Sequence, residues 1–144
     1  MVFAPDAASC HAPCAPQPLR RVLATAENTM QIIDFSRDHA SPIEIFDSIS
    51  VSNVRIGGGQ GETHVYCVYF KPGGSIGEHP AGYAQLFLVV DGEGWAAGAD
   101  GHRIPLLAGQ GAYFAPGEAH SKGSETGMTV IMVQAEQLTP EPLQ

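Results

Sequence analysis

The chain has 144 residues, of which 44% are apolar, so it is long enough to bury one hydrophobic core, and its size suggests a single domain. It carries a formal net charge of −8 with only seven Lys or Arg residues. So few cations leave no basic stripe that could neutralise phosphates or follow an anionic membrane surface. We therefore expect neither nucleic acid nor a membrane as a partner.

Cysteine content and hydropathy indicate the compartment. Three cysteines do not make a disulfide framework, and no apolar run approaches the roughly 18 residues that a membrane-spanning helix requires. The N-terminus also lacks the basic region and following apolar region of a secretory signal. These features predict a cytoplasmic protein.

The start of the chain differs from the rest in its amino-acid composition. Residues 1–29 are rich in Ala and Pro, and their apolar residues follow no period, so we interpret them as an extension outside the core. Residues 30–138 form the predicted single domain, with Met30–Phe35 as its first strand. Residues 139–144 form a short tail.

Downstream of residue 29 the sequence predicts strands. The 17 glycines and 11 prolines of the chain punctuate short apolar runs rich in Val, Ile, Tyr and Phe, which is typical of an all-β fold with many turns. The strands predicted after the first are residues 51–56, 64–71, 85–90, 94–97, 103–107, 112–115 and 128–134.

Turn residues separate these strands. Asp91–Gly92 and Asp100–Gly101 each lie between two strands and predict hairpins, and Gly57–Gly59 predicts a further turn. Strands that close into a small barrel, or pack as two sheets, would remove most exposed edges and leave an interior mouth where a ligand could bind.

Two spaced motifs carry the chemistry. The first places Gly73, His79, Ala81, Gln85 and Gly92 at intervals that resemble the first cupin motif, G-x5-H-x-H-x3-E-x6-G. The spacing fits at every position, although two ligand positions hold other residues.

The second motif runs from Gly109 through Gly117 and His120 to Ser124, and it resembles the second cupin motif, G-x5-P-x-G-x2-H-x3-N. Its glycines and its histidine match. The chain is thus similar to small single-domain cupins over about residues 55–135. The resemblance implies an all-β fold, the double-stranded β-helix or jelly-roll barrel.

The resemblance also implies a metal site with missing ligands. In cupins of this pattern two histidines, a glutamate and a later histidine bind one metal in the barrel mouth. Here His79 and His120 remain, Gln85 stands in the glutamate position, and Ala81 replaces the second histidine. An amide oxygen offers a cation only a dipole, and alanine offers nothing. We expect a partial site of His79, Gln85 and His120 that holds Fe, Mn, Zn or Ni weakly.

Other residues could complete this site. A neighbouring strand could direct His64 and Tyr66 into the same cavity, which makes His64 the best replacement ligand and Tyr66 a candidate catalytic residue; a surface or strand-end histidine is the alternative for His64. Glu118 is a second candidate, although a solvated carboxylate in its turn is favoured. Cys67 alternates with Tyr66 and should be a buried, inert thiol on the opposite face.

The missing histidine at position 81 leaves space for a small polar ligand. Tyr83 and Phe87 could line that pocket beside Gln85, and the Tyr83 hydroxyl could act on a substrate. For Phe87, ordinary core packing is the favoured interpretation, because barrel interiors need bulky fillers.

Two functions from different classes remain open. The first is a small cupin that binds a polar molecule in the barrel mouth, with a partial metal site that supports oxygenase, isomerase or lyase chemistry. A metal-free variant of this enzyme would use His79 or His120 as a general base and the Gln85 amide to hold an oxyanion. The second is a metal-free ligand-binding module, a sensor or carrier without catalysis.

The resemblance further implies a homodimer, because most small oligomers use isologous contacts and members of this family commonly pair. The segment Met30–Phe35 is the expected contact.

Overall fold

The structure is a computed structural model that describes residues 30–141; the predicted extension at residues 1–29 lies outside the described residues. The described part contains ten strands, one 3-10 helix and no α-helix. The elements are β1 (Gln31–Asp34), η2 (Arg37–His39), β2 (Ser41–Pro42), β3 (Ser52–Asn53), β4 (Gly57–Phe70), β5 (Ser75–Pro80), β6 (Ala84–Ala97), β7 (Arg103–Leu107), β8 (Gln110–Phe114), β9 (Ala119–Gly123) and β10 (Met128–Pro140).

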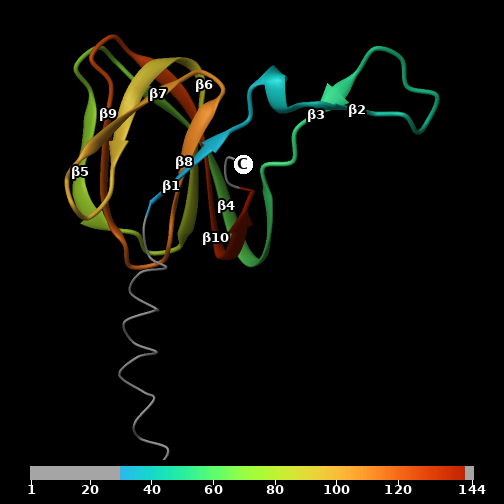
Figure 1. Cartoon of the computed structure of the whole chain (residues 1–144). Coiled ribbons are helices and arrows are strands. Elements are labelled where there is room, and N and C mark those ends of the chain that lie inside the picture. Colours follow the sequence, from blue (N-terminus) through green and yellow to red (C-terminus); the bar gives the residue numbers. More distant parts are fainter. Residues whose placement is uncertain (1–29, 142–144) are drawn as a thin grey trace, which may run out of the picture.

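The strands form a two-layered barrel (Figure 1). One layer has the order β1-β8-β6-β10-β4. In the other layer β5 pairs with β9, and both β9 and β7 pair with the second half of β6. All of these pairings are antiparallel. The predicted all-β jelly-roll architecture is therefore confirmed.

The strand β6 belongs to both layers, and this corrects the hairpin predicted at Asp91–Gly92. The chain does not reverse there. It continues from the layer shared with β10 into the layer shared with β7, and the register with β10 shifts at this point. Gly92 has a φ of 77°, and a Cβ at this position would collide with the carbonyl oxygen of Gly127. Glycine is required because the strand bends against neighbouring backbone.

A second correction concerns the segment before β4. The run Gly57–Gly59 is not a turn, because it forms the first residues of β4 and pairs with the end of β10. A Cβ on Gly59 would collide with the Gln137 carbonyl oxygen, so the run allows close backbone approach. The strand predicted at 51–56 is reduced to β3, and β10 extends two residues past the predicted boundary at 138.

The hydrophobic core fills the space between the layers. Its buried members are Phe70, Phe87, Val89, Ala96, Leu106, Ala112, Phe114, Met128 and Val130. They come from β4, β6, β7, β8 and β10, as expected when one face of each strand turns inward. Within residues 30–141 no helix has the length and apolar character needed to cross a membrane.

A segment between β1 and β4 leaves the barrel (Figure 1). Residues 37–56, which we call the arm, contain η2 and a two-stranded ladder in which Ser41 pairs with Asn53 and Pro42 with Ser52. The loop at its end carries large apolar side chains in solvent, so the arm lacks a core of its own.

Candidate functional site

The two motif histidines meet in the barrel, as the sequence predicts. Strands β5 and β9 place His79 directly opposite His120, and the two Nε2 atoms lie 3.2 Å apart. The His79 side chain is exposed, whereas His120 is completely buried. Ala81, in the position of the missing histidine, is buried, and its N–H donates to the Glu118 carbonyl oxygen.

Hydrogen bonds assign the tautomers of this pair. The Nδ1–H of His79 donates to the Gly77 carbonyl oxygen at 2.8 Å, so the Nε2 of a neutral His79 carries the lone pair. The Nε2–H of His120 then donates to it, which leaves the His120 Nδ1 as an acceptor. This buried Nδ1 has no hydrogen-bond partner among the described residues.

Burial keeps His120 neutral. Removal from water lowers the pKa of His120 from 6.5 to about 3, and the positive charge of Lys122 and the proximity of His79 act in the same direction. The edge of the His120 ring also contacts Phe114, with ring centroids 4.4 Å apart. At neutral pH His120 therefore acts as a weakly basic, uncharged imidazole.

Lys122 is the site residue that the sequence interpretation missed. Its side chain is fully buried, and its ammonium donates a hydrogen bond to the Oε1 of Gln85. The Nζ atom lies 5.0 and 5.3 Å from the ring centroids of Phe87 and Phe114. Burial lowers the pKa of Lys122 to about 8. A signal was present, because residue 122 follows His120 by two and shares its face of β9.

This ammonium bears on whether the site fits a resident metal. Gln85, the predicted neutral ligand, has its carbonyl oxygen bound to Lys122. No group of three His, Cys, Asp or Glu side chains with metal-binding geometry occurs within residues 30–141. A divalent ion here would have two histidines, no carboxylate and a buried cation beside it, whereas catalytic zinc sites use three protein ligands. The described residues therefore do not fit a resident divalent metal.

A separate cluster occupies the rim. His64 shares a face of β4 with Phe70 of the core and with the partly buried Val68, and its Nε2–H donates to Glu62 at 2.8 Å. The Tyr83 hydroxyl donates to the same carboxylate at 3.2 Å. Both hydrogen bonds lower the pKa of Glu62, and the one from His64 has the larger effect. His64 is thus paired with Glu62 and does not complete a ligand set with His79 and His120.

The structure changes the interpretation of other residues. Glu118 is buried rather than solvated, and its Oε1 accepts from the Ala115 N–H at 3.0 Å, because the turn folds over its own carboxylate. Cys67 is exposed rather than buried, because the outer face of the edge strand β4 has no covering layer. Phe87 lies in the core, and Tyr66 is 46% exposed.

The comparisons with known proteins agree with this architecture. Residues 66–134 match the family model described as the cupin domain. A search of curated proteins found no match.

Several solved structures are similar to part of the chain. A cupin-like protein from Thermotoga maritima is 21% identical, with a TM-score of 0.49 over 56% of this chain and 65% of its own. An RmlC-like cupin from Shewanella frigidimarina is 19% identical, with a TM-score of 0.49 over 68% and 94%. A predicted oxalate decarboxylase from Thermotoga maritima is 24% identical, with a TM-score of 0.45 over 54% and 84%.

The matched residues include the strands that carry His79, Gln85 and His120, and they form the barrel described above. Residues 66–134 therefore match a cupin domain.

Proposed function

We propose that this protein binds a small carboxylate-bearing molecule in its barrel mouth without a resident metal, with the Lys122 ammonium in place of the metal's positive charge. The observation that carries the proposal is the bond from Lys122 to Gln85 inside the barrel. A buried cation is costly unless it is paired. A ligand carboxylate would supply the anionic partner that no described residue provides.

The groups around Lys122 define the ligand. An ammonium has three N–H donors, and the structure describes one hydrogen bond from that of Lys122, to Gln85. The Gln85 amide nitrogen adds donors of its own, while the unpartnered Nδ1 of His120 is an acceptor. Donors for an oxyanion beside an acceptor for a hydroxyl are complementary to a small hydroxycarboxylate. Because Lys122 and His120 are buried, such a ligand enters by displacing the exposed His79 ring.

The same features favour binding over acid–base catalysis by His120. A general base works best with a pKa near the operating pH, and burial takes the pKa of His120 to about 3. In the hypothesis of a metal-free enzyme, the general base would then have to be His79, and the Gln85 amide hydrogens would hold an oxyanion.

The test is titration calorimetry of the full chain, at pH 7 and without added metal, with a panel of small carboxylates and hydroxycarboxylates. Lys122→Met is the test variant, and Lys71→Met is the matched control because Lys71 is exposed. The proposal predicts saturable binding by the wild type and by Lys71→Met, and loss of at least tenfold in affinity for Lys122→Met. Equal binding by all three proteins, or none by the wild type, would overturn it.

A metal-dependent oxygenase, isomerase or lyase is the second candidate, and one observation favours it: the Nε2 atoms of His79 and His120 converge to 3.2 Å. Elemental analysis of untagged protein, purified without chelator, separates the two functions. Near-stoichiometric iron, manganese, zinc or nickel that disappears in His120→Ala would establish the metal centre. Protein that stays metal-free after incubation with each ion supports the Lys122 site.

A further inference from the structure

Gln85, Gln134 and His64 lie side by side on adjacent strands of the barrel. In the two ladders of β10, Gln134 pairs with Gln85 of β6 on one side and with His64 of β4 on the other. Residues that pair in this way project from the same face of a sheet. Adjacent strands are about 4.8 Å apart, so these three residues, which we call the polar row, extend over roughly 10 Å.

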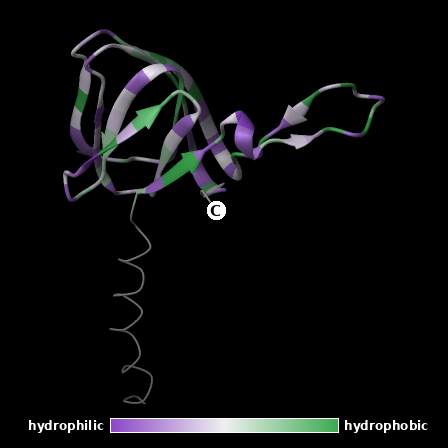
Figure 2. Cartoon of the chain, turned by 45° about the horizontal axis from the view of Figure 1, so that its top comes forward, coloured by the Kyte–Doolittle hydropathy of each residue, from purple (hydrophilic) through white to green (hydrophobic). Residues whose placement is uncertain are grey.

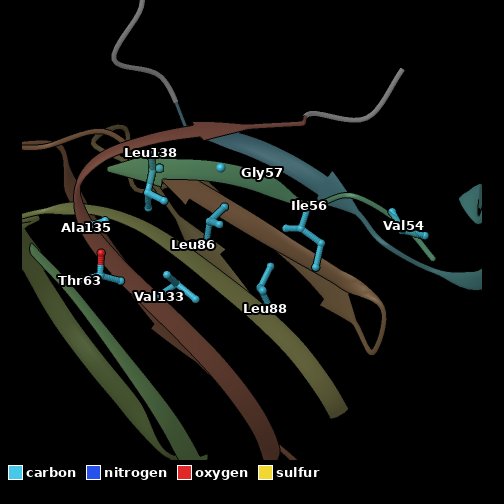
Figure 3. Close-up of a pocket in the computed structure, with 11 residues that line it drawn as sticks. Val54, Ile56, Gly57, Thr63, Leu86, Leu88, Val133, Ala135 and Leu138 are labelled. Carbon is cyan, nitrogen blue, oxygen red and sulfur yellow. The ribbon is translucent and has the colours of Figure 1, made fainter. Parts of the chain in front are cut away.

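The polar row lies on the inward face of its layer. Residues next to its members in the sequence line a groove on the outside of the layer, and Figure 3 shows Leu86, Val133 and Thr63 directed into this groove. Successive side chains of a strand point to opposite faces. The polar row therefore projects into the barrel. Figure 2 shows the resulting bands of hydrophilic and hydrophobic residues along the barrel strands.

The inward face becomes more polar toward the rim. Deeper along the same three strands, the aligned residues are mostly core members or pack against the core, and they are Tyr66, Met132, Phe87, Val68, Val130 and Val89. The change to amide and imidazole groups occurs at the level of Lys122, whose ammonium donates to Gln85. The polar row thus begins at the proposed carboxylate site and leads away from it.

The polar row has hydrogen-bonding groups to offer a ligand. Gln85 uses its carbonyl oxygen for Lys122, which leaves its amide hydrogens to donate. Gln134 is half-buried, and no residue of the described part of the chain forms a hydrogen bond with its side-chain amide. His64 donates its Nε2–H to Glu62, so the Nδ1 of the neutral ring is an acceptor. A buried or half-buried polar group of this kind requires a partner.

We infer that the ligand is a polyhydroxylated carboxylate of the aldonate class, with about five or six carbons to match the length of the polar row. The inference rests on the proposed function, in which Lys122 binds the carboxylate. A hydroxyl both donates and accepts, as does the primary amide of Gln134. Hydroxyl oxygens accept from the amides of the polar row, and their O–H groups donate to the Nδ1 atoms of His120 and His64.

The surroundings of the polar row favour hydroxyls over two other kinds of ligand tail. An apolar tail would remove the Gln134 amide and the His64 Nδ1 from water without giving them partners, which is costly. A second carboxylate would meet Glu62 at the end of the row. The hydrogen bonds from His64 and Tyr83 lower the pKa of Glu62 and so keep it charged. A terminal hydroxyl, in contrast, can donate to that carboxylate.

The test is titration calorimetry of the full chain at pH 7 without added metal. Gluconate and its epimers galactonate and mannonate are compared with glycolate, a short hydroxycarboxylate, and with hexanoate, a six-carbon carboxylate without hydroxyls. We expect the best aldonate to bind about tenfold more tightly than either, the effect of two or three additional hydrogen bonds. Equal affinities overturn the inference, and so does tighter binding of hexanoate or of 6-aminohexanoate than of every aldonate.

A variant pair assigns this preference to the polar row. Gln134→Met keeps the length of the side chain and removes its hydrogen-bonding groups, and it should lower aldonate affinity about tenfold more than glycolate affinity. Gln31→Met is the matched control, because Gln31 shares the outward face of β1 with Ile33 of the second cluster. Circular dichroism checks that both variants fold. Equal losses for aldonate and glycolate in Gln134→Met, or the same change in Gln31→Met, contradict the role of the row.

Failure of this inference is distinguishable from failure of the proposed function. Glycolate binding that is lost in Lys122→Met, without any preference for aldonates, leaves the Lys122 site in place and overturns the polar row alone. A wild-type protein that binds none of these carboxylates overturns both.

Discussion

Lys122 and Gln85 are joined by a hydrogen bond inside the barrel, at the position where the motif spacing predicts that Gln85 would face a metal. The pair changes the electrostatics of the interior. The motif that the chain resembles has a glutamate at this position, whereas this chain has a neutral amide opposite a buried ammonium. Several properties that can be measured depend on this exchange.

The stability contribution of Lys122 should depend on pH. Its folded pKa of about 8 lies below its usual 10.5, so between these values the unfolded state binds more protons and stability rises with pH. Below pH 8 the full cost of burying the charged Lys122 ammonium, about 3 kcal/mol from the pKa shift, opposes folding. We expect the stability advantage of Lys122→Met over wild type to shrink by about that amount from pH 7 to above pH 10. Urea unfolding of both proteins measures it, and a pH-independent difference would contradict it.

His120 should make the protein sensitive to acid. Its folded pKa of about 3 lies below the usual 6.5, so the unfolded state binds more protons in that interval and stability falls as pH falls through it. The loss attributable to this group is up to about 5 kcal/mol. His120→Gln cannot titrate, and its free energy of unfolding should decline less between pH 6.5 and pH 4. Parallel declines of the two proteins would show that other groups cause the acid sensitivity.

Gly92 should tolerate no side chain. Its φ of 77° and the carbonyl oxygen of Gly127 both oppose a Cβ, and we expect Gly92→Ala to lower the free energy of unfolding by about 2–4 kcal/mol. Gly82→Ala is the matched control, because no atom lies within 4 Å of the place that its Cβ would occupy and its φ is not positive. Thermal unfolding should separate the two variants, and equal transition temperatures would refute the strain argument.

Glu118 should act through its acceptor oxygen rather than its charge. The Ala115 N–H donates to it, and burial raises the pKa of this carboxyl. Glu118→Gln keeps an acceptor and removes a buried charge, so its stability at pH 7 should equal or exceed that of the wild type. Glu118→Ala leaves a buried N–H unpaired and should cost about 1–3 kcal/mol. Chemical denaturation of the three proteins checks this order, and a loss in Glu118→Gln as large as in Glu118→Ala would show that the charge matters.

The sequence predicted the fold because its signals are local. Alternating apolar residues and glycine turns require only neighbours in the chain, and the turn at Asp100–Gly101 connects β6 to β7 as expected. The turn at Asp91–Gly92 was misassigned because the same dipeptide also suits a bend within a strand. Which of the two forms depends on β10 and β7, the partners that β6 finds across the two layers.

By itself the sequence predicted the all-β fold from its strand and turn signals, which are local, and the meeting of His79 with His120 from its resemblance to the two cupin motifs. Only the tertiary structure decided how those side chains are used. It placed the Lys122 ammonium on Gln85, paired His64 with Glu62, buried Glu118 and left the arm tip exposed. These outcomes depend on distances between segments far apart in the chain, and on the cost of burying charge, which no local pattern records.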